Sequence, residues 1–267
     1  SFNGRSGYGH LFRSMALEIE LRKRGHQCYW SKKLGGSVNT DWWIVDTPKL
    51  PDYTPSFIRS GKLCYLGATG NAEYDGSLLS VCDLVVYQGA VDHQVDKRWL
   101  AGFEYALLWP GLYVTEDQER KVLVYRSVYQ NMEDIALELE NNGIPVHLTT
   151  GGSVRNDKQL CSSAVVITPW GMTSLEAMYL GIPQVAISFQ KHARHSAIEA
   201  SKSGAMHLLF SDEHAWKERA VNEALLLLGE FSIDGATYIS MSEAGRKLID
   251  GQGAMRVADA LESRQNA

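Results

Sequence analysis

The sequence lacks the features that mark several classes of protein. Its 4 cysteines form no CxxC pair, so they indicate neither a disulfide framework nor a zinc site. No apolar run is long enough to cross a bilayer, and no signal peptide is recognisable. We therefore expect a cytoplasmic protein with reduced thiols and no membrane span.

The sequence also lacks an excess of positive charge. It has 26 Lys+Arg against 31 Asp+Glu, a formal net charge of −5, and no basic block. This charge balance does not indicate a nucleic-acid or membrane partner, although a local basic groove would not be visible in the net charge of the whole chain. Tandem repeats and low-complexity tracts are absent as well. The 267 residues are enough for two domains of ordinary size.

One stretch of the chain combines a strand, a glycine turn and a helix. The apolar residues 164–167 predict a buried strand, and helical spacing begins after Gly171. The backbone N–H groups that would face outward at the positive end of this helix belong to Met172, Thr173 and Ser174. Such an end suits a phosphate group, and Glu176 lies where a carboxylate can accept hydrogen bonds from ribose hydroxyls. The alternative is an ordinary α/β crossover with a capped helix.

A glycine-rich loop at residues 4–9 opens the chain and leads to His10. Residues 11–24 have helical spacing, and residues 28–30 predict a strand. We expect the first strand of this unit to be very short or to lie before Ser1, and the GxGxxG fingerprint is not matched. His10 would project into a crevice at the carboxyl edge of the sheet, where imidazole suits proton transfer. A structural histidine that caps the loop is the alternative.

Asp46 directly follows a predicted strand at residues 42–45. Its carboxylate could orient His10 or touch an acceptor, or it could simply form a turn before Thr47 and Pro48. Further strands are predicted at residues 63–66 and 84–87, each followed by a loop that contains glycine. The repetition favours a parallel sheet with helices on both faces.

The pattern restarts after an aromatic-rich segment at residues 96–115, which predicts a linker between domains 1–112 and 113–267. In the second domain we expect strands at 122–125, 146–148, 184–188 and 207–210. We expect helices at 132–142, 192–203, 213–228 and 243–263, the last interrupted near residue 251, and the end of a short helix or turn at 159–162. The fold class is therefore α/β, with two Rossmann-like domains that face across a cleft.

Several segments resemble one group of enzymes. Residues 7–13 resemble the motif GxGHxxR, residues 101–108 resemble AGxxYALL, residues 168–183 are similar to SxGGxTxxEAxxLGxP, and residues 248–258 resemble DGxGAxRVA. Asp46 matches an Asp-containing strand end. These motifs are similar to those of the GT-B-fold relatives of PseG, the UDP-sugar hydrolase of pseudaminic acid synthesis, and of SpsG, a predicted spore-coat glycosyltransferase, with MurG more distant.

The resemblance implies a UDP-sugar, or a similar nucleotide sugar, bound mainly by the second domain. By carry-over, His10 would be the general base and Glu176 would hold the ribose. The residues that would bind the rest of the nucleotide sugar are Gly9, Gly171, Met172, Thr173 and Ser174. No metal and no cofactor are expected, because a helix dipole can stabilise the diphosphate and no DxD-like cluster is present.

Two positions depart from the pattern of this group. Members of this group place a Gly-Gly-Ser-Asp turn where the phosphates pass, and this chain has residues 125–129 there instead. Arg126 would either replace the lost phosphate contact as a clamp or lie on the surface. An expected Asn-Gln pair is replaced by His192 and Ala193. Both departures favour a diverged glycosyltransferase over the pathway hydrolase.

Three functions remain open from the sequence. The favoured one is transfer of a sugar from its nucleotide to a hydroxyl acceptor, either a carbohydrate or a modified nucleic-acid base. The second is hydrolysis, with water as the acceptor, and the third is nucleotide-sugar binding without catalysis. The aromatic residues that would stack on a ligand or pack in the core are Trp42, Trp43, Tyr87 and Trp99. The pair His192 and His195 has helical spacing for a metal but no evident third ligand.

Overall fold

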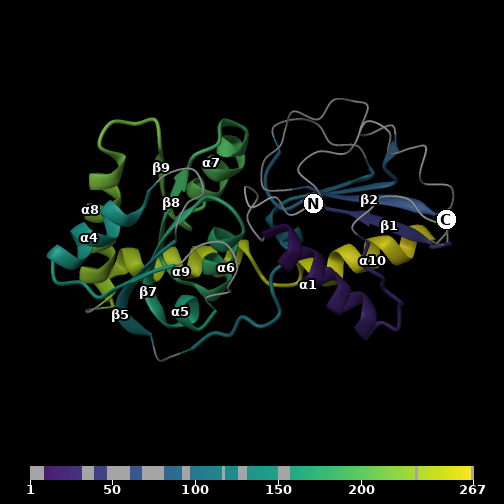
Figure 1. Ribbon diagram of the computed structural model, residues 1–267, viewed down its shortest axis with the longest axis horizontal. Coiled ribbons are helices and arrows are strands. Elements are labelled where there is room, and N and C mark those ends of the chain that lie inside the picture. Colours follow the sequence, from purple (N-terminus) through teal and green to yellow (C-terminus); the bar gives the residue numbers. More distant parts are fainter. Residues whose placement is uncertain are drawn as a thin grey trace. The chain divides into compact units, whose positions relative to one another are not determined.

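The computed structural model describes residues 9–31, 39–46, 61–67, 81–91, 97–115, 118–125, 131–149, 157–231 and 234–265. They form two compact units, each built on a parallel sheet (Figure 1). Unit 1 consists mainly of His10–Leu108 and Gly251–Ala267, and unit 2 mainly of Trp109–Asp250.

The sheet of unit 1 has the strand order β1-β2-β3-β4, and every pair is parallel. Its strands are β1 (Trp42–Val45), β2 (Lys62–Gly67), β3 (Leu84–Tyr87) and β4 (Trp99–Ala101). β3 is buried along its whole length, as expected for a parallel sheet that is covered on both faces. Side chains alternate along β2, so that Cys64 and Leu66 join one core cluster while Leu63 and Tyr65 join the other.

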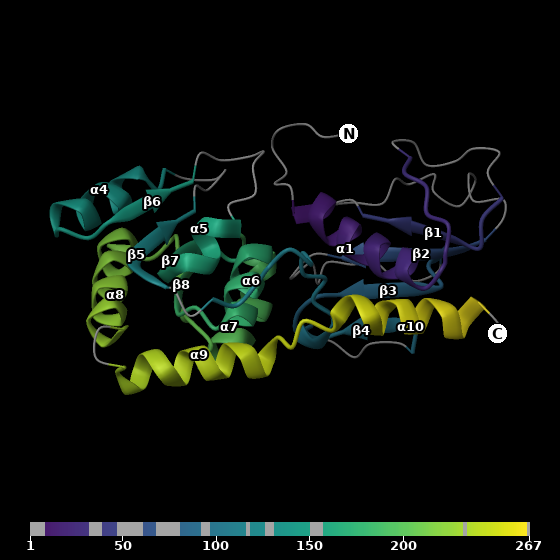
Figure 2. The same cartoon turned by 90° about the horizontal axis from the view of Figure 1, so that it is seen from below.

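Helices α1 (Gly9–Lys23) and α10 (Gly253–Gln265) pack on one face of this sheet (Figure 2). Leu17 of α1 and Leu261 of α10 share a core cluster with Leu66 and Val86 of the strands. Arg24, just after α1, also forms ion pairs with Asp259 at 2.6 Å and Glu262 at 2.8 Å. These ion pairs lie at the surface, where each adds about 0–1 kcal/mol, so apolar packing holds α10 in place.

The start of α10 lies directly on the segment that contains the short helix η1 (Phe103–Tyr105). A Cβ atom on Gly253 would lie 2.2 Å from the carbonyl oxygen of Ala106, and Arg256 Nη1 donates to the carbonyl of Glu104 at 2.9 Å. Two of the recognised motifs, at residues 101–108 and 248–258, therefore contact each other. The last helix thus belongs to unit 1, whereas the expected ranges 1–112 and 113–267 assign it to the second domain.

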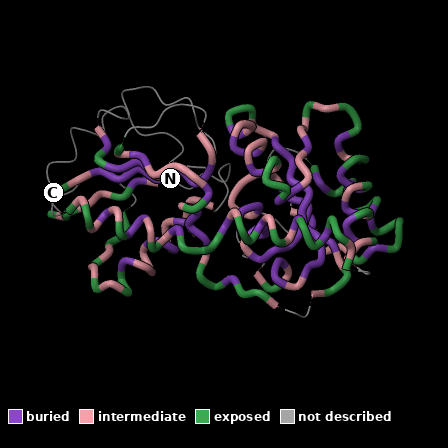
Figure 3. The backbone as a smooth tube through the Cα atoms, turned by 180° about the vertical axis from the view of Figure 1, so that it is seen from behind, coloured by how far each residue is buried: buried purple, intermediate pink, exposed green. Residues whose placement is uncertain are grey.

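The sheet of unit 2 has the order β6-β5-β7-β8-β9 and is parallel throughout. Its strands are β5 (Glu119–Val124), β6 (Val146–Leu148), β7 (Ser163–Pro169), β8 (Gln184–Ser188) and β9 (His207–Phe210). Its helices are α4 (Glu133–Asn141), α5 (Asp157–Ser162), α6 (Met172–Leu180), the short η2 (Lys191–Ala193), α7 (Arg194–Lys202), α8 (Trp216–Phe231) and α9 (Ala236–Leu248). β8 is entirely buried and β7 is buried up to its last residue, so the central strands run through the core (Figure 3).

The strand order of unit 2 has a functional consequence. Numbered within the unit, the order is 2-1-3-4-5, a common doubly wound arrangement whose order reverses between strands 1 and 3. Here those strands are β5 and β7. Ligands of such sheets bind outside the carboxyl ends of the strands at this switch point. α6 follows β7 directly and therefore begins at the switch point.

Most of the predicted elements are confirmed, but two predictions in unit 1 are wrong. Residues 28–30 form no strand: Arg22 Nη2 donates to the carbonyl of Cys28 at 2.6 Å and Trp30 Nε1 to Glu18 at 2.6 Å, so this segment is tied to α1. β4 lies within the segment predicted as a linker, because its three residues pair with β3.

Some predicted helix limits also differ. The helix predicted at 243–263 is two helices, α9 and α10, and α9 begins earlier than predicted. The helix predicted at 192–203 is divided into η2 and α7. None of the helices among the described residues has both the length and the apolarity that a bilayer crossing requires.

Candidate functional site

A buried polar cluster lies at the amino end of α1. His10, Arg13 and Ser14 have the spacing i, i+3 and i+4, which places them on one side of the helix. The same side continues with Leu17, which is buried against the sheet. Asp46 follows the last residue of β1. The helix and the strand end therefore bring these four polar side chains together within unit 1.

Four hydrogen bonds reach the carboxylate of Asp46. Its Oδ1 accepts from His10 Nδ1 at 2.5 Å and from Arg13 Nη2, and its Oδ2 accepts from Arg13 Nε at 2.6 Å and Ser14 Oγ at 2.8 Å. An ionised carboxylate has about four lone-pair sites, so this one has no capacity left for a further ligand. Of the roles considered for Asp46, the contacts favour orienting His10 over touching an acceptor.

The hydrogen bonds also determine which nitrogen of His10 carries its proton. Arg13 Nη2 lies 2.8 Å from His10 Nδ1, but a guanidinium can only donate, and its two Nη2 hydrogens are directed to Asp46 and to the carbonyl of Leu66 at 3.2 Å. We therefore assign a proton to Nδ1, which donates to Asp46. The lone pair of the neutral ring is then on Nε2.

Exposure separates His10 from its partners. The side chain of His10 is 25% exposed, whereas those of Arg13 and Asp46 are 3% and 6% exposed. Burial alone would raise the pKa of Asp46, but the charge of Arg13 and the hydrogen bonds from Arg13 and His10 outweigh it and hold the pKa below its ordinary value. Asp46 is therefore ionised at neutral pH, and the imidazole is the part of the cluster that reaches solvent.

The second candidate feature is the amino end of α6 in unit 2. Gly171 is the N-cap and offers no side-chain hydrogen bond, so the N–H groups of Met172, Thr173 and Ser174 have no partner from the cap or from the helix itself. A Cβ atom on Gly171 would meet no heavy atom within 4 Å. The free backbone donors and the positive end of the dipole at this helix end suit an anion.

The remaining predicted residues of this helix face inward. Ser174 is fully buried, and its hydroxyl donates to the carbonyl of Pro169 at 3.4 Å, so its side chain ties the helix to β7. Gln184 Nε2 donates to the carbonyl of Ser174 at 2.9 Å. Glu176 is only 6% exposed, and its role with ribose stays a prediction. Gly9 is the first residue of α1, and Arg126 lies outside the described residues.

The aromatic and histidine candidates divide into two groups. Tyr87 and Trp99 stack on each other in the core of unit 1, with ring centroids 5.6 Å apart, so they are packing residues. Trp42 and Trp43 are half-buried in β1. His192 and His195 lie in η2 and α7. Within the described ranges no three His, Cys, Asp or Glu side chains are grouped to hold a metal ion.

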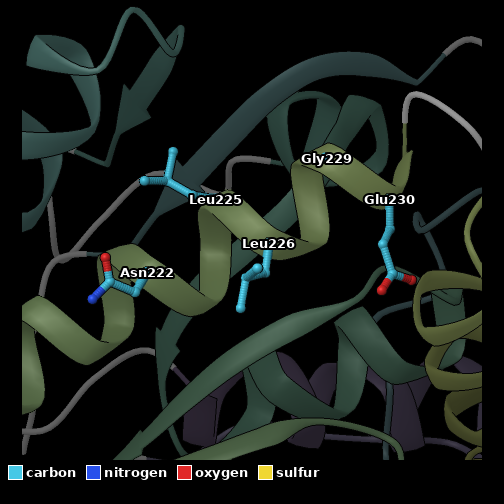
Figure 4. Close-up of a pocket in the computed structure, with 5 residues that line it drawn as sticks. All are labelled: Asn222, Leu225, Leu226, Gly229 and Glu230. Atoms are coloured by element: carbon cyan, nitrogen blue, oxygen red, sulfur yellow. The ribbon is translucent and has the colours of Figure 1, made fainter.

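A hollow on α8 contains none of the predicted residues (Figure 4). The residues drawn there are Asn222, Leu225, Leu226, Gly229 and Glu230. Its carboxylate, Glu230, accepts the backbone N–H of Tyr238 at 2.9 Å and so caps the start of α9. Because the hollow combines apolar side chains with a carboxylate that is already paired, we keep the two features above, each within its own unit, as the candidates.

Sequence reasoning included Arg13 in the motif at residues 7–13 without giving it a role, and it missed Ser14. Their signal is the helical spacing from His10 along the side of α1 that also carries Leu17 and Leu21. A charged residue on a side that is otherwise apolar requires a buried partner. That spacing could have identified Arg13 as a partner of Asp46.

Comparisons with known proteins give matches in structure alone. No protein-family model matches the chain, and no curated protein matches its sequence. Among solved structures, MurG from Acinetobacter baumannii is 10% identical over 96% of both chains, with a TM-score of 0.61. MnaA from S. aureus, solved with UDP, is 12% identical over 95% of this chain and 81% of that chain, with a TM-score of 0.57.

A UDP-N-acetylglucosamine 2-epimerase is 14% identical over 93% of this chain and 76% of that chain, with a TM-score of 0.53. Identities this low show the fold and nothing beyond it. The solved structures and the two parallel-sheet units agree with the fold class expected from the sequence. The chain has the GT-B fold, with two Rossmann-like domains.

Proposed function

We propose that the protein is a glycosyltransferase that uses a nucleotide sugar, with a UDP-sugar as the first candidate, and passes the sugar to a hydroxyl acceptor. The observation that carries the proposal is the orientation of His10, whose Nδ1 donates to Asp46 and whose Nε2 bears the lone pair. A base placed in this way takes a proton from a hydroxyl group as that group attacks. His10 is accordingly the proposed general base, and Asp46 orients it.

The proposed step balances as a single displacement. The acceptor oxygen forms a bond to the anomeric carbon while its proton moves to His10 Nε2. The bond between the anomeric carbon and the diphosphate oxygen breaks, and its electron pair leaves with the nucleoside diphosphate. Negative charge therefore develops on the diphosphate, and a helix amino end can stabilise it.

We assign the donor nucleotide to the amino end of α6. Support comes from its uncapped N–H groups, from its position at the switch point of the sheet, and from the motif at residues 168–183. The solved neighbours include a complex with UDP and an enzyme named for a UDP-sugar, which supports uridine as the base. Glu176 on the ribose, Arg126 on the phosphates and Gly9 near the substrate complete the proposal.

A UDP-sugar hydrolase is the second candidate. It uses the same groups with water as the acceptor, and the motifs shared with the PseG and SpsG group support it. The changed positions at residues 125–129 and at His192 and Ala193 support the transferase instead. The acceptor would be a carbohydrate or a modified nucleic-acid base.

Product analysis distinguishes these functions. The purified protein is incubated with a panel of UDP-sugars, with and without a pool of hydroxyl acceptors, and release of nucleoside diphosphate is followed by mass spectrometry of the products. Release only with acceptor, together with an acceptor that gains the mass of the sugar, is expected for the transferase. Free sugar without acceptor identifies a hydrolase. Binding without release from any nucleotide sugar, including those with other bases, contradicts both and leaves a binding protein.

A further inference from the structure

Arg13 is a buried cation that has no role in the proposed reaction. It is 2% exposed, although it lies near the start of a helix where its side chain could have reached water. Burial of a guanidinium is costly unless the group is paired and its hydrogen bonds are made. Asp46 pairs with it, and the carbonyls of Leu66 at 3.2 Å and Gly67 at 3.3 Å accept further hydrogen bonds.

The guanidinium contacts both oxygens of Asp46 at once. Arg13 Nε donates to Oδ2 and Nη2 donates to Oδ1, so the two planar groups face each other as a fork. Rotation of the carboxylate about its Cβ–Cγ bond would break both contacts. The carbonyls that hold the other side of the guanidinium lie at the end of β2, the neighbour of β1. Arg13 therefore fixes Asp46 relative to two strand ends and to the helix that carries His10.

We propose that Arg13 is a positioning residue for the general base: it holds the Asp46 carboxylate in the single orientation that accepts the Nδ1–H of His10. The consequence for catalysis rests on the proposed function, whereas the consequence for the histidine ring does not. Without Arg13, Asp46 is a buried carboxyl group with weaker reason to stay ionised. A protonated Asp46 would donate to Nδ1, the ring proton would move to Nε2, and the ring could no longer act as a base toward the acceptor.

Three variants test this role. Arg13→Lys keeps the charge but loses the fork, and Arg13→Ala removes both. Arg22→Ala is the matched control, because it removes a guanidinium from the same helix that pairs with Glu18 at 2.8 Å, outside this cluster. The tautomer of His10 is measured from ring ¹⁵N chemical shifts of the full chain in the absence of substrate. We expect a protonated Nδ1 in the wild type and in Arg22→Ala, and a shift toward protonated Nε2 in both Arg13 variants.

Kinetics give the second readout. With the nucleotide sugar that the wild type uses, kcat of Arg13→Ala is expected to fall at least about 10²-fold while KM for the donor stays within about threefold, because only the contribution of the base is lost. Added guanidinium is expected to restore part of the rate. Arg13→Lys is expected to stay slow, and Arg22→Ala is expected to stay within about threefold of the wild type, since the ion pair that it loses lies at the surface.

The outcomes separate this inference from the proposed function. A folded Arg13→Lys that keeps the wild-type tautomer, and keeps kcat where turnover is measurable, overturns the positioning role. If the wild type turns over no nucleotide sugar, the proposed function fails, and the tautomer measurement still decides for or against Arg13. If Arg13→Ala does not fold, Arg13→Lys supplies the same comparison.

Discussion

At the scale of single residues, the site depends on one saturated carboxylate. Every acceptor position of Asp46 is used within the cluster, so its orientation follows from its neighbours and not from a ligand. An ion pair of this kind, between side chains 3% and 6% exposed, is destabilising when one partner is removed, because the other charge stays buried. The site and the stability of unit 1 are therefore linked.

Asp46→Asn is expected to lower the free energy of unfolding by about 3–5 kcal/mol at pH 7, because Arg13 loses its counter-ion. The pKa of Asp46 is lowered in the folded state, so this stabilisation is complete above the unfolded value of about 3.9 and is lost as the pH falls through the lower folded value. The difference between wild type and variant should therefore shrink below about pH 4. Urea unfolding at several pH values measures it, and a difference independent of pH contradicts the account.

Gly171→Ala tests the anion site without disturbing the fold. The added methyl group would meet no heavy atom within 4 Å, so we expect the melting temperature to change little. The methyl group would stand at the N-cap, beside the helix end to which we assign the diphosphate, and nucleotide affinity should fall about tenfold or more, which corresponds to about 1.4 kcal/mol. Calorimetric titration with UDP is the measurement. Unchanged affinity would place the nucleotide elsewhere.

Sequence reasoning identified His10 and Asp46 as candidates and gave contact between them as one alternative, but it gave Arg13 and Ser14 no part in that contact. A strand-end Asp and a histidine after a glycine loop are visible as local patterns. Arg13 is different, because an arginine in a helix is usually at the surface, and its burial depends on a partner 33 residues away in the chain. That Asp46 has no free acceptor site is likewise a property of the folded cluster.

At the scale of helices and strands, the long apolar signals were predicted correctly, and the two wrong predictions in unit 1 concern short segments. β7 and α6 combine a continuous apolar run with a glycine turn, so their type follows from the sequence. β4 has three residues and is a strand only because β3 lies beside it. The aromatic segment at residues 28–30 has strand-like composition, but its Tyr29 is 77% exposed and makes no sheet contact among the described strands.

Gly253→Ala is expected to weaken the packing of α10 on unit 1. Its methyl group would be forced against the backbone of Tyr105 and Ala106, which cannot move aside as a flexible side chain would. Such overpacking costs about 1–3 kcal/mol. Gly229→Ala in α8 is the control: its methyl group meets nothing within 4 Å, so the variant should gain up to about 1 kcal/mol from helix propensity. Thermal unfolding compares the two, and equal shifts in Tm would contradict the packing described here.

At the scale of the whole molecule, each unit has its own core and its own buried thiols. Cys64 lies in the cluster that α10 completes in unit 1, and Cys161 is 2% exposed in unit 2. The repeated strand–helix pattern predicts two such sheets from the sequence. That pattern does not predict that the last helix, α10, packs on unit 1. The residues that α10 contacts, 104–106, are far from it along the chain.

The thiols provide a separate reporter for each unit. Burial raises the pKa of the Cys64 thiol and shields this thiol from alkylating agents in the native state. If α10 completes the core of unit 1, Gly253→Ala should speed alkylation of Cys64 severalfold and leave that of Cys161 unchanged. Mass spectrometry of peptides after a timed pulse of iodoacetamide measures both sites. A parallel increase at both thiols would mean that the two cores do not open independently.

His10→Ala tests whether His10 is the base for cleavage of a nucleotide sugar. Release of nucleoside diphosphate is measured at saturating donor for the wild type and the variant, together with the donor Kd by calorimetry. We predict that kcat falls about 10²–10⁴-fold while Kd stays within about threefold, since general-base catalysis is lost and nucleotide binding is kept. A variant that releases nucleoside diphosphate at the wild-type rate would contradict the assignment of His10.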